Sequence, residues 1–257
     1  MQGRIDSLYH YPIKGLSPQA LASVALTPGE GFPFDRNFGF ARHDSGFDPA
    51  HPQPLPKDRF LMLARDARLA GLDTSFDPAT RHLTIRAEGR EVLSADLASK
   101  AGIAAAEAFF ATMFAMTAAR SPRFVHAAPH RFTDVAVVSP QMMNAVSLVN
   151  LASIRALEEK SGQAVAPLRF RANIYFDGWP AFAEFDLIGQ EITVAGVPMR
   201  MLKRIRRCAA TEVNPDTATR DLKVPRLLHQ HFGHADMGVY AEVLAPGNLA
   251  PSDLVQA

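Results

Sequence analysis

Cys208 is the only cysteine among the 257 residues of this chain, and this count limits what can hold the fold together. An intrachain disulfide is impossible, so the chain has no disulfide framework and must rely on a packed core. Hydrophobic residues make up 47% of the sequence, which is ample material for such a core. The same count excludes an iron–sulfur cluster held by four cysteines. At this length, one large domain and two packed parts are both possible.

The charge balance narrows the classes of partner. The chain carries 27 basic and 26 acidic residues, a formal net charge of +1. No global field therefore points to nucleic acid or to a membrane surface, and any electrostatic recognition must be local. The N-terminus has no apolar run of signal-peptide length, and no stretch approaches the roughly 20 apolar residues of a membrane span. We expect a cytoplasmic protein.

The first half of the chain has the pattern of short strands followed by one helix. Alternating or β-rich stretches predict strands at Arg4–Tyr9, Leu21–Leu26, Phe34–Arg42, His82–Ala87 and Glu91–Leu93, the last two forming a hairpin around Glu88-Gly89-Arg90. A proline-rich stretch from His43 to Lys57 indicates a loop. Ala95–Met116 is rich in Ala, Leu, Phe and Met at helical spacing and predicts a helix.

The second half also mixes strands with few helices. Ser121–Arg131 resembles a linker or junction. Ser147–Lys160 indicates a loop entering a helix that Asn150 or Ser153 could cap. Strands are predicted at Val135–Val138, Phe170–Phe176, Gln190–Leu202 and Val239–Val243. This pattern favours an α+β, β-rich fold.

Cys208 ends the most basic stretch of the chain, Lys203-Arg204-Ile205-Arg206-Arg207-Cys208. Neighbouring cations lower the pKa of a thiol and so favour the thiolate, which is both a nucleophile and a soft metal ligand. A free cysteine also often packs as a small buried hydrophobe, so a structural role stays open. The following Asn214-Pro215-Asp216 favours a tight exposed loop, which a core cysteine does not need.

Common catalytic signatures are absent from the sequence. There is no phosphate-binding loop ending in Gly-Lys-Ser/Thr, no dinucleotide fingerprint, no serine nucleophile elbow and no His-Glu-x-x-His motif. One metal hypothesis remains at His229-Gln230-His231-Phe232-Gly233-His234. If this segment were a strand, His229 and His231 would share a face and could bind zinc with Cys208. The alternative is that these histidines are simply solvated.

Four separated segments together resemble a known family. They are Tyr11-Pro12-Ile13-Lys14-Gly15, Gly31-Phe32-Pro33-Phe34-Asp35-Arg36, Arg169-Phe170-Arg171-Ala172-Asn173-Ile174, and Arg207-Cys208 through Val213-Asn214-Pro215-Asp216-Thr217. In this order, and with the closing Gly238-Val239-Tyr240-Ala241-Glu242-Val243, they resemble MOSC domain proteins that carry the N-terminal MOSC β-barrel domain. The chain is similar to bacterial reductases of N-hydroxylated compounds and to the mitochondrial amidoxime-reducing component.

The resemblance implies a fold and a set of site residues. It implies an N-terminal β-barrel-like domain with helical insertions over residues 1–120, and a MOSC-type β-barrel over residues 121–257. It implies that Cys208 ligates molybdenum held by a pterin, and that Asp216 acts with Cys208 in catalysis. The residues implied to bind the cofactor are Lys14, Arg36, Arg171 and Arg207 at its phosphate, with Asn150, Ser153, Asn173 and Thr211 around the pterin. Because strict alternation would place Arg207 and Cys208 on opposite faces, this assignment requires the strand to end or twist at Arg207.

The resemblance also implies an activity. We expect a molybdenum-cofactor-dependent oxidoreductase that reduces the N–O bond of small N-hydroxylated compounds. With no spare cysteine and no dinucleotide fingerprint, its electrons should come from a separate donor protein of the ferredoxin, flavin reductase or cytochrome type. Two alternatives stay open: a sulfur-transfer module with a persulfide on Cys208, and a non-catalytic carrier of the molybdenum cofactor.

Three residues depart from the family pattern. Gly15 stands where serine is usual, which removes a hydroxyl donor, and Asn214 and Ala218 stand where aspartate and glycine are commoner. We expect the loss of glycine at 218 to disfavour any positive φ there.

Overall fold

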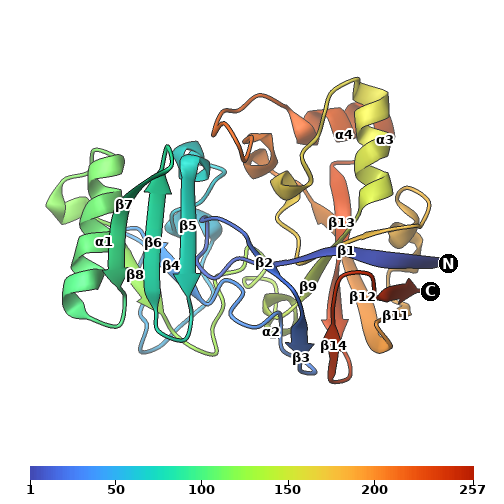
Figure 1. Cartoon of the computed structure of the whole chain (residues 1–257), viewed down its shortest axis with the longest axis horizontal. Helices are drawn as coiled ribbons and strands as arrows, with labels where there is room; N and C mark the ends of the chain where they lie inside the picture. Colours follow the sequence, from blue (N-terminus) through green and yellow to red (C-terminus); the bar gives the residue numbers. More distant parts are fainter.

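The computed structural model describes residues 1–257, which form two lobes joined side by side (Figure 1). The larger lobe is a β-barrel with helices on its outside, and both chain termini lie on it. The smaller lobe is a three-stranded sheet and a short strand pair packed with one long helix.

Seven strands close the barrel of the larger lobe. Their order is β10-β9-β13-β12-β11-β15-β1, and β1 pairs back onto β10. Neighbours are antiparallel except β9 and β10, which are parallel. The strands are β1 (Gln2–His10), β9 (Val146–Asn150), β10 (Ile174–Asp177), β11 (Glu191–Val194), β12 (Val197–Arg206), β13 (Asp236–Val243) and β15 (Leu254–Gln256). The short β2 (Gln19–Leu21) extends the sheet beyond β1, and β3 (Val24–Leu26) pairs with β14 (Gly247–Leu249).

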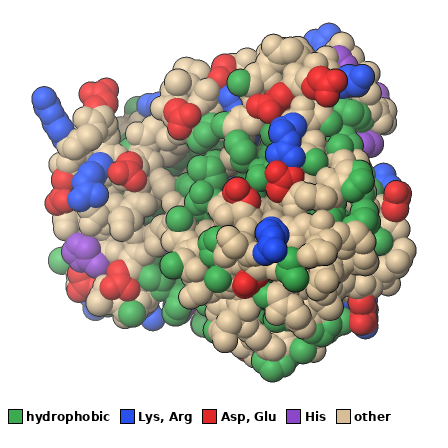
Figure 2. Space-filling model, turned by 45° about the vertical axis from the view of Figure 1, so that its right-hand side comes forward, with side chains coloured by type: hydrophobic (Ala, Val, Ile, Leu, Met, Phe, Trp, Pro, Cys, Tyr) green, Lys and Arg blue, Asp and Glu red, His purple; other side chains and the backbone are tan.

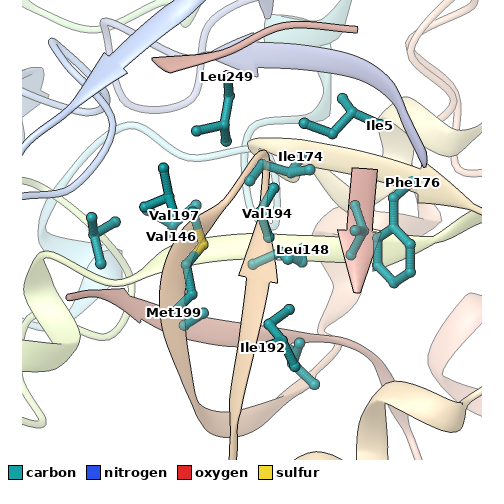
Figure 3. Packing of buried hydrophobic residues seen from close by; sticks show 14 of the residues in the cluster. Ile5, Val146, Leu148, Ile174, Phe176, Ile192, Val194, Val197, Met199 and Leu249 are labelled. Atoms are coloured by element: carbon teal, nitrogen blue, oxygen red, sulfur yellow. The ribbon is translucent and has the colours of Figure 1, made fainter. Parts of the chain in front are cut away.

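Alternation along the barrel strands builds the main core. In β12 the inward residues Val197, Met199 and Met201 are buried while Arg200 and Arg204 are exposed. Such side chains from all seven strands meet inside the barrel, in a cluster of 21 buried residues (Figure 3). Burying each large aliphatic side chain contributes about 1.5–3 kcal/mol, so this cluster is a main source of stability.

Two helices cover one side of the barrel. In α3 (Leu151–Ser161) the side chain of Asn150 accepts a hydrogen bond from Ala152 N at 3.1 Å, and Gly162 ends the helix in a left-handed conformation. These caps satisfy backbone groups that a helix end leaves unpaired. The helix packs with α4 (Val224–Phe232) over a second cluster of buried residues outside the barrel.

The smaller lobe is built on a meander. β5 (Leu72–Asp77), β6 (His82–Ala87) and β7 (Arg90–Asp96) form an antiparallel sheet, and α1 (Lys100–Met113) packs against it. β4 (Phe38–Ala41) pairs with β8 (Arg123–His126). The short helix α2 (Pro140–Met143) lies instead beside the larger lobe, where it contacts β13. Ser99 caps α1 by accepting a hydrogen bond from Gly102 N at 3.0 Å.

The β-rich α+β fold is confirmed, and so are most of the predicted elements. The strand at Arg4–Tyr9, the hairpin around Glu88–Arg90 and the helix capped by Asn150 are all present. Gln190–Leu202, predicted as one alternating run, is instead two strands, β11 and β12, because the chain reverses at Ala195 and Gly196, both with positive φ.

Other predictions were wrong. Val135–Val138 forms turns rather than a strand: no strand lies beside it, and Val137 and Val138 are 50% and 58% exposed. The predicted linker Ser121–Arg131 contains β8. The histidine segment begins inside α4, so the alternation that a strand would give does not apply to His229 and His231.

The two halves of the sequence do not map one to one onto the two lobes. β1 belongs to the first 120 residues, yet it closes the barrel between β10 and β15. The division of the chain into domains of residues 1–120 and 121–257 stays a prediction.

Candidate functional site

A cavity of about 310 Å³ lies where the two lobes meet. The N-terminal third of the chain contributes Lys14, Arg36 and Lys57 to its wall, and the barrel lobe contributes Arg171 and Cys208. The wall also holds Asp35, Asp134, Asn173, Lys203, Arg204, Arg206, Arg207, Thr211 and Tyr240. Cations outnumber carboxylates around this cavity, although charges of both signs are interspersed over the surface seen in Figure 2.

Cys208 reaches this cavity because β12 ends two residues before it. The strand stops at Arg206, and its pairing with β13 shifts register between Arg204 and Arg206. The strand therefore ends before Arg207, as the site assignment for Arg207 and Cys208 requires. The thiol is half-buried, and its Sγ accepts a hydrogen bond from Lys57 Nζ at 3.2 Å.

A chain of charges links Cys208 to Lys14. Lys57 Nζ lies 3.2 Å from Asp134 Oδ2, and the other oxygen of Asp134 pairs with the buried Lys14. Lys14 also donates to Phe132 O at 2.9 Å. Burial would raise the pKa of Asp134, but the two lysines hold it well below its usual range. Burial lowers the pKa of Lys14, and Asp134 opposes this shift.

Arg36 and Arg171 meet over one tyrosine ring. Their guanidinium carbons lie 4.6 Å and 4.3 Å from the centroid of Tyr11, which is completely buried. Arg36 pairs with Asp35 and donates to Arg171 O at 3.0 Å. The Arg171 guanidinium makes no hydrogen bond or ion pair within the protein, and its backbone is left-handed, with φ of 51°. Burial, with a contribution from the neighbouring charge of Arg36, lowers the pKa of Arg171 to about 10.

Arg207 differs from Arg171 in having its donors engaged. Its Nε donates to Met237 O at 2.8 Å, its Nη2 donates to the same oxygen, and its Nη1 donates to Phe170 O at 2.9 Å. These bonds tie the start of β13 to the turn before β10. Of the four cations expected to bind phosphate, all line the cavity, but Arg171 alone has an uncommitted guanidinium.

Asn173 and Thr211 also line the cavity, with side chains committed to the backbone or to a neighbouring serine. Asn173 accepts from Ser147 N and Oγ, at 3.1 and 2.8 Å, and donates to Tyr9 O at 3.2 Å, which joins β1, β9 and β10. Thr211 Oγ1 donates to Cys208 O at 2.9 Å and fixes the turn after the thiol.

Asn150 and Ser153 do not reach the cavity, so their placement differs from the pterin contacts expected of them. Both are fully buried beside the fully buried Glu184, to which Asn150 Nδ2 and Ser153 Oγ donate at 3.5 and 3.3 Å. Asn150 Nδ2 also donates to Pro180 O at 2.9 Å. Their polar groups are used within the barrel lobe, because one caps α3 and both enclose a carboxyl group.

Asp216 likewise lies outside the main cavity. It lines a neighbouring cavity of about 340 Å³, which shares Arg171 with the first, and its backbone N–H donates to Asn214 Oδ1 at 2.8 Å. Ala218 in the same loop has φ of 56°, so the loop keeps a left-handed residue despite the loss of glycine. Gly15 has φ of 84°, and a Cβ there would lie 3.0 Å from Leu61 O, so a serine at this position would be strained.

The sequence did not identify Lys57, Asp134 or Tyr240 as site residues. Lys57 ends a proline-rich loop that showed no chemical motif, and Asp134 precedes a segment predicted as a strand. Each contacts partners far away in the chain; Lys57 and Cys208 are 151 residues apart. A weak signal for Tyr240 was its place in the closing segment of the family resemblance.

The histidine hypothesis has no support in the structure. No group of three or more His, Cys, Asp or Glu side chains is placed to hold a metal ion. His234 instead packs edge-on against Phe182 and Phe185, with ring centroids 5.4 and 5.3 Å apart. No helix of the chain is both long and apolar enough to cross a bilayer.

The fold and site define a two-lobed β-barrel protein with a cationic interlobe cavity and a single thiol in its wall. The model of the MOSC domain matches residues 125–256, and that of the MOSC N-terminal β-barrel domain matches residues 2–121. The chain therefore belongs to the MOSC domain family. MOSC domains are associated in general with binding of the molybdenum cofactor, and the family includes oxidoreductase-like members.

Comparisons with individual proteins add little to this. A comparison with curated proteins found no match. Among solved structures, the chain is similar to the YuaD protein from Bacillus subtilis, at 14% identity over 99% of this chain and 94% of that one, with a TM-score of 0.45. It is also similar to YiiM from Geobacillus stearothermophilus, at 18% identity over 44% of this chain and 53% of that one, with a TM-score of 0.34.

Proposed function

We propose that this protein is a molybdenum-cofactor-dependent oxidoreductase that reduces N-hydroxylated compounds with electrons from a separate protein. The observation that carries the proposal is the placement of Cys208 in one cavity wall with Lys14, Arg36 and Arg171. These residues come from distant segments and combine one soft ligand with cationic donors for an anion.

The residues of the cavity fit such a cofactor. The half-buried Cys208 offers a thiolate, which is a soft ligand for molybdenum. The Arg171 guanidinium has its planar donors free, as a phosphate group requires, while Lys14 and Arg36 add charge beside it. Asn173 and Thr211 would support the site indirectly by fixing β1 and the turn after Cys208.

The reaction is the conversion of an N-hydroxylated amine or amidoxime to the parent amine or amidine. Two electrons and two protons enter, the N–O bond breaks, and the oxygen leaves as water. A bound molybdenum centre would supply the two-electron change at the substrate. Lys57 and Asp134 would hold the thiol in place and keep the entrance charged, and Tyr240 would narrow the pocket beside them.

Electrons would arrive from a donor such as a ferredoxin, flavin reductase or cytochrome. The support is that the sequence has no dinucleotide fingerprint and no second cysteine for a dithiol relay. Lys203 and Arg204 line the cavity, are exposed and form no ion pair, so they could attract an acidic donor.

The test is turnover by the purified protein. With reduced viologen as donor, an N-hydroxylated substrate such as benzamidoxime should be converted to benzamidine. With NADH or NADPH alone, and contaminating reductases excluded, no product should form. NADH-driven turnover by the isolated chain would contradict the proposed electron route, and no turnover of protein that contains molybdenum would contradict the activity.

Sulfur transfer is a second candidate, favoured by the contact between Lys57 Nζ and Cys208 Sγ. An ammonium group at 3.2 Å would stabilise a thiolate or persulfide as well as a metal thiolate. This candidate predicts sulfur that cyanide releases from Cys208 in protein that contains no molybdenum. A carrier of the cofactor would instead contain molybdenum and pterin but reduce no substrate.

A further inference from the structure

Tyr11 is placed in the anion pocket in a way that the proposed function does not explain. Its ring is fully buried and lies under the guanidinium groups of both Arg36 and Arg171. It is anchored on several sides: its N–H donates to Asp35 Oδ1 at 2.8 Å, its carbonyl accepts from Arg36 N at 2.8 Å, and its hydroxyl donates to Ala172 O at 3.2 Å. The ring therefore has a fixed position relative to both cations.

Two like charges that contact the same ring need a source of attraction. Asp35 supplies it for Arg36, but no carboxylate or carbonyl contacts the Arg171 guanidinium. The negative face of an aromatic ring attracts a guanidinium, and more strongly where water is excluded, as it is around Tyr11. Burial and the charge of Arg36 both act to lower the pKa of Arg171.

A ring and a carboxylate affect the N–H donors of the Arg171 guanidinium differently. A carboxylate would take up the N–H donors of Arg171 in a bidentate pair and cancel its charge. A ring face attracts the same group without accepting its in-plane N–H donors. Arg171 is thus held in one orientation while its donors stay free for an incoming anion, so less has to be ordered when the anion binds.

We propose that Tyr11 is the positioning residue of the anion pocket: its ring holds the guanidinium groups of Arg36 and Arg171 in fixed positions, ready for a phosphate group. This inference rests on the proposed function only in that the cavity must bind an anion. It assigns to the first residue of the Tyr-Pro-Ile-Lys segment a role through its ring face, and makes the hydroxyl secondary.

The experiment measures binding of inorganic phosphate to the purified cofactor-free chain at low ionic strength by calorimetry. The variants are Tyr11→Phe, which keeps the ring face, and Tyr11→Leu, which removes it. Tyr9→Leu is the matched control, because Tyr9 packs edge-on against Tyr175 and contacts neither arginine. We expect Tyr11→Phe and Tyr9→Leu to bind phosphate as the wild type does, and Tyr11→Leu to bind about tenfold more weakly.

A second substitution separates the ring face from packing if Tyr11→Leu fails to fold. Pentafluorophenylalanine at position 11 nearly keeps the shape of phenylalanine but removes the negative face of the ring. It should weaken phosphate binding relative to Tyr11→Phe while the protein still unfolds in one cooperative thermal transition in the absence of phosphate. Equal affinity of these two proteins for phosphate would overturn the role of Tyr11. If the wild type binds no phosphate, the anion pocket itself is wrong and the inference falls with it.

Discussion

The cluster around Glu184 and the cavity around Arg171 are both built from buried polar side chains, but they differ in where their partners lie. Glu184 receives hydrogen bonds from Asn150 and Ser153 inside the barrel lobe. The Arg171 guanidinium packs over the face of Tyr11, and its hydrogen-bond donors are free. Buried polar groups are costly unless paired, so we propose that a ligand completes the structure at the unpaired group. Asn150 and Arg171 look equally functional in the sequence, and only the structure separates them.

The largest expected effect comes from removing the thiol. Cys208→Ser should abolish reduction of N-hydroxylated substrates, because a hydroxyl group is a poor ligand for a soft metal. The thermal unfolding midpoint should stay close to that of the wild type, since the side chain is half-exposed and its loss leaves no large cavity. The measurement is viologen-supported turnover together with a thermal melt. Full activity of a variant that retains metal would show that Cys208 does not belong to the reacting part of the cavity.

The cluster around Glu184 should make the stability of the fold depend on pH, and it should not affect cofactor binding. Burial raises the pKa of Glu184 from 4.5 to about 7. The folded chain therefore binds an extra proton between these values, and stability falls as pH rises from about 4.5 to 7. Glu184→Gln should remove this slope and gain on the order of 3 kcal/mol at pH 8 relative to the wild type.

Chemical denaturation from pH 5 to 8 checks this prediction, with Glu159→Gln on the exposed face of α3 as the control. Only the difference between Glu184→Gln and the wild type is diagnostic, because buried histidines titrate in the same range. Identical slopes for the two proteins would mean that Glu184 ionises freely and that the cluster is not closed. Cofactor content should not change in either variant.

Replacing Arg171 should weaken cofactor binding in the cavity. Arg171→Met should weaken retention of a phosphate-bearing cofactor by about 1.5–3 kcal/mol, the contribution of a hydrogen bond to a charged group. Its effect on the unfolding free energy should be small, since the guanidinium makes no hydrogen bond within the protein. Arg155→Met is the control, because Arg155 is exposed and pairs with Asp177 away from the cavity. Retention of pterin after gel filtration measures the difference, and equal retention by both variants would remove Arg171 from the site.

The smallest expected effect concerns the rim of the cavity. Lys203→Gln and Arg204→Gln should lower the rate supported by an acidic donor such as reduced ferredoxin by a few-fold at low salt, and less as salt rises. The viologen-supported rate should change little. Lys160→Gln, at the end of α3, is the matched control for the loss of one exposed charge. A donor-supported rate that does not depend on salt would argue against docking at Lys203 and Arg204.

Local sequence patterns predicted most of the helices and strands. They missed features that depend on residues far apart in the chain. Alternation in Arg4–Tyr9 predicted β1 because each strand residue reports its own face. The same reasoning failed for Val135–Val138, where an apolar run has no strand to pair with and stays exposed. The motifs predicted that Lys14, Arg36, Arg171 and Cys208 would share a cavity, as they do.

The sequence alone does not show which arginine side chains have free hydrogen-bond donors. Whether an arginine is free or engaged depends on carbonyl groups elsewhere in the fold: Arg207 is held by Met237 O, which lies 30 residues away. Lys57 was missed for the same reason, since its partner Cys208 comes from the other lobe.

The central claim is that the open cavity holds the molybdenum cofactor with Cys208 as ligand. The most direct test is the molybdenum and pterin content of the chain, purified from cells that make the cofactor, beside that of Cys208→Ser. We predict stoichiometric molybdenum and pterin in the wild type and a large loss of molybdenum in the variant. Wild-type protein that contains neither, and that releases sulfur with cyanide instead, would contradict the claim.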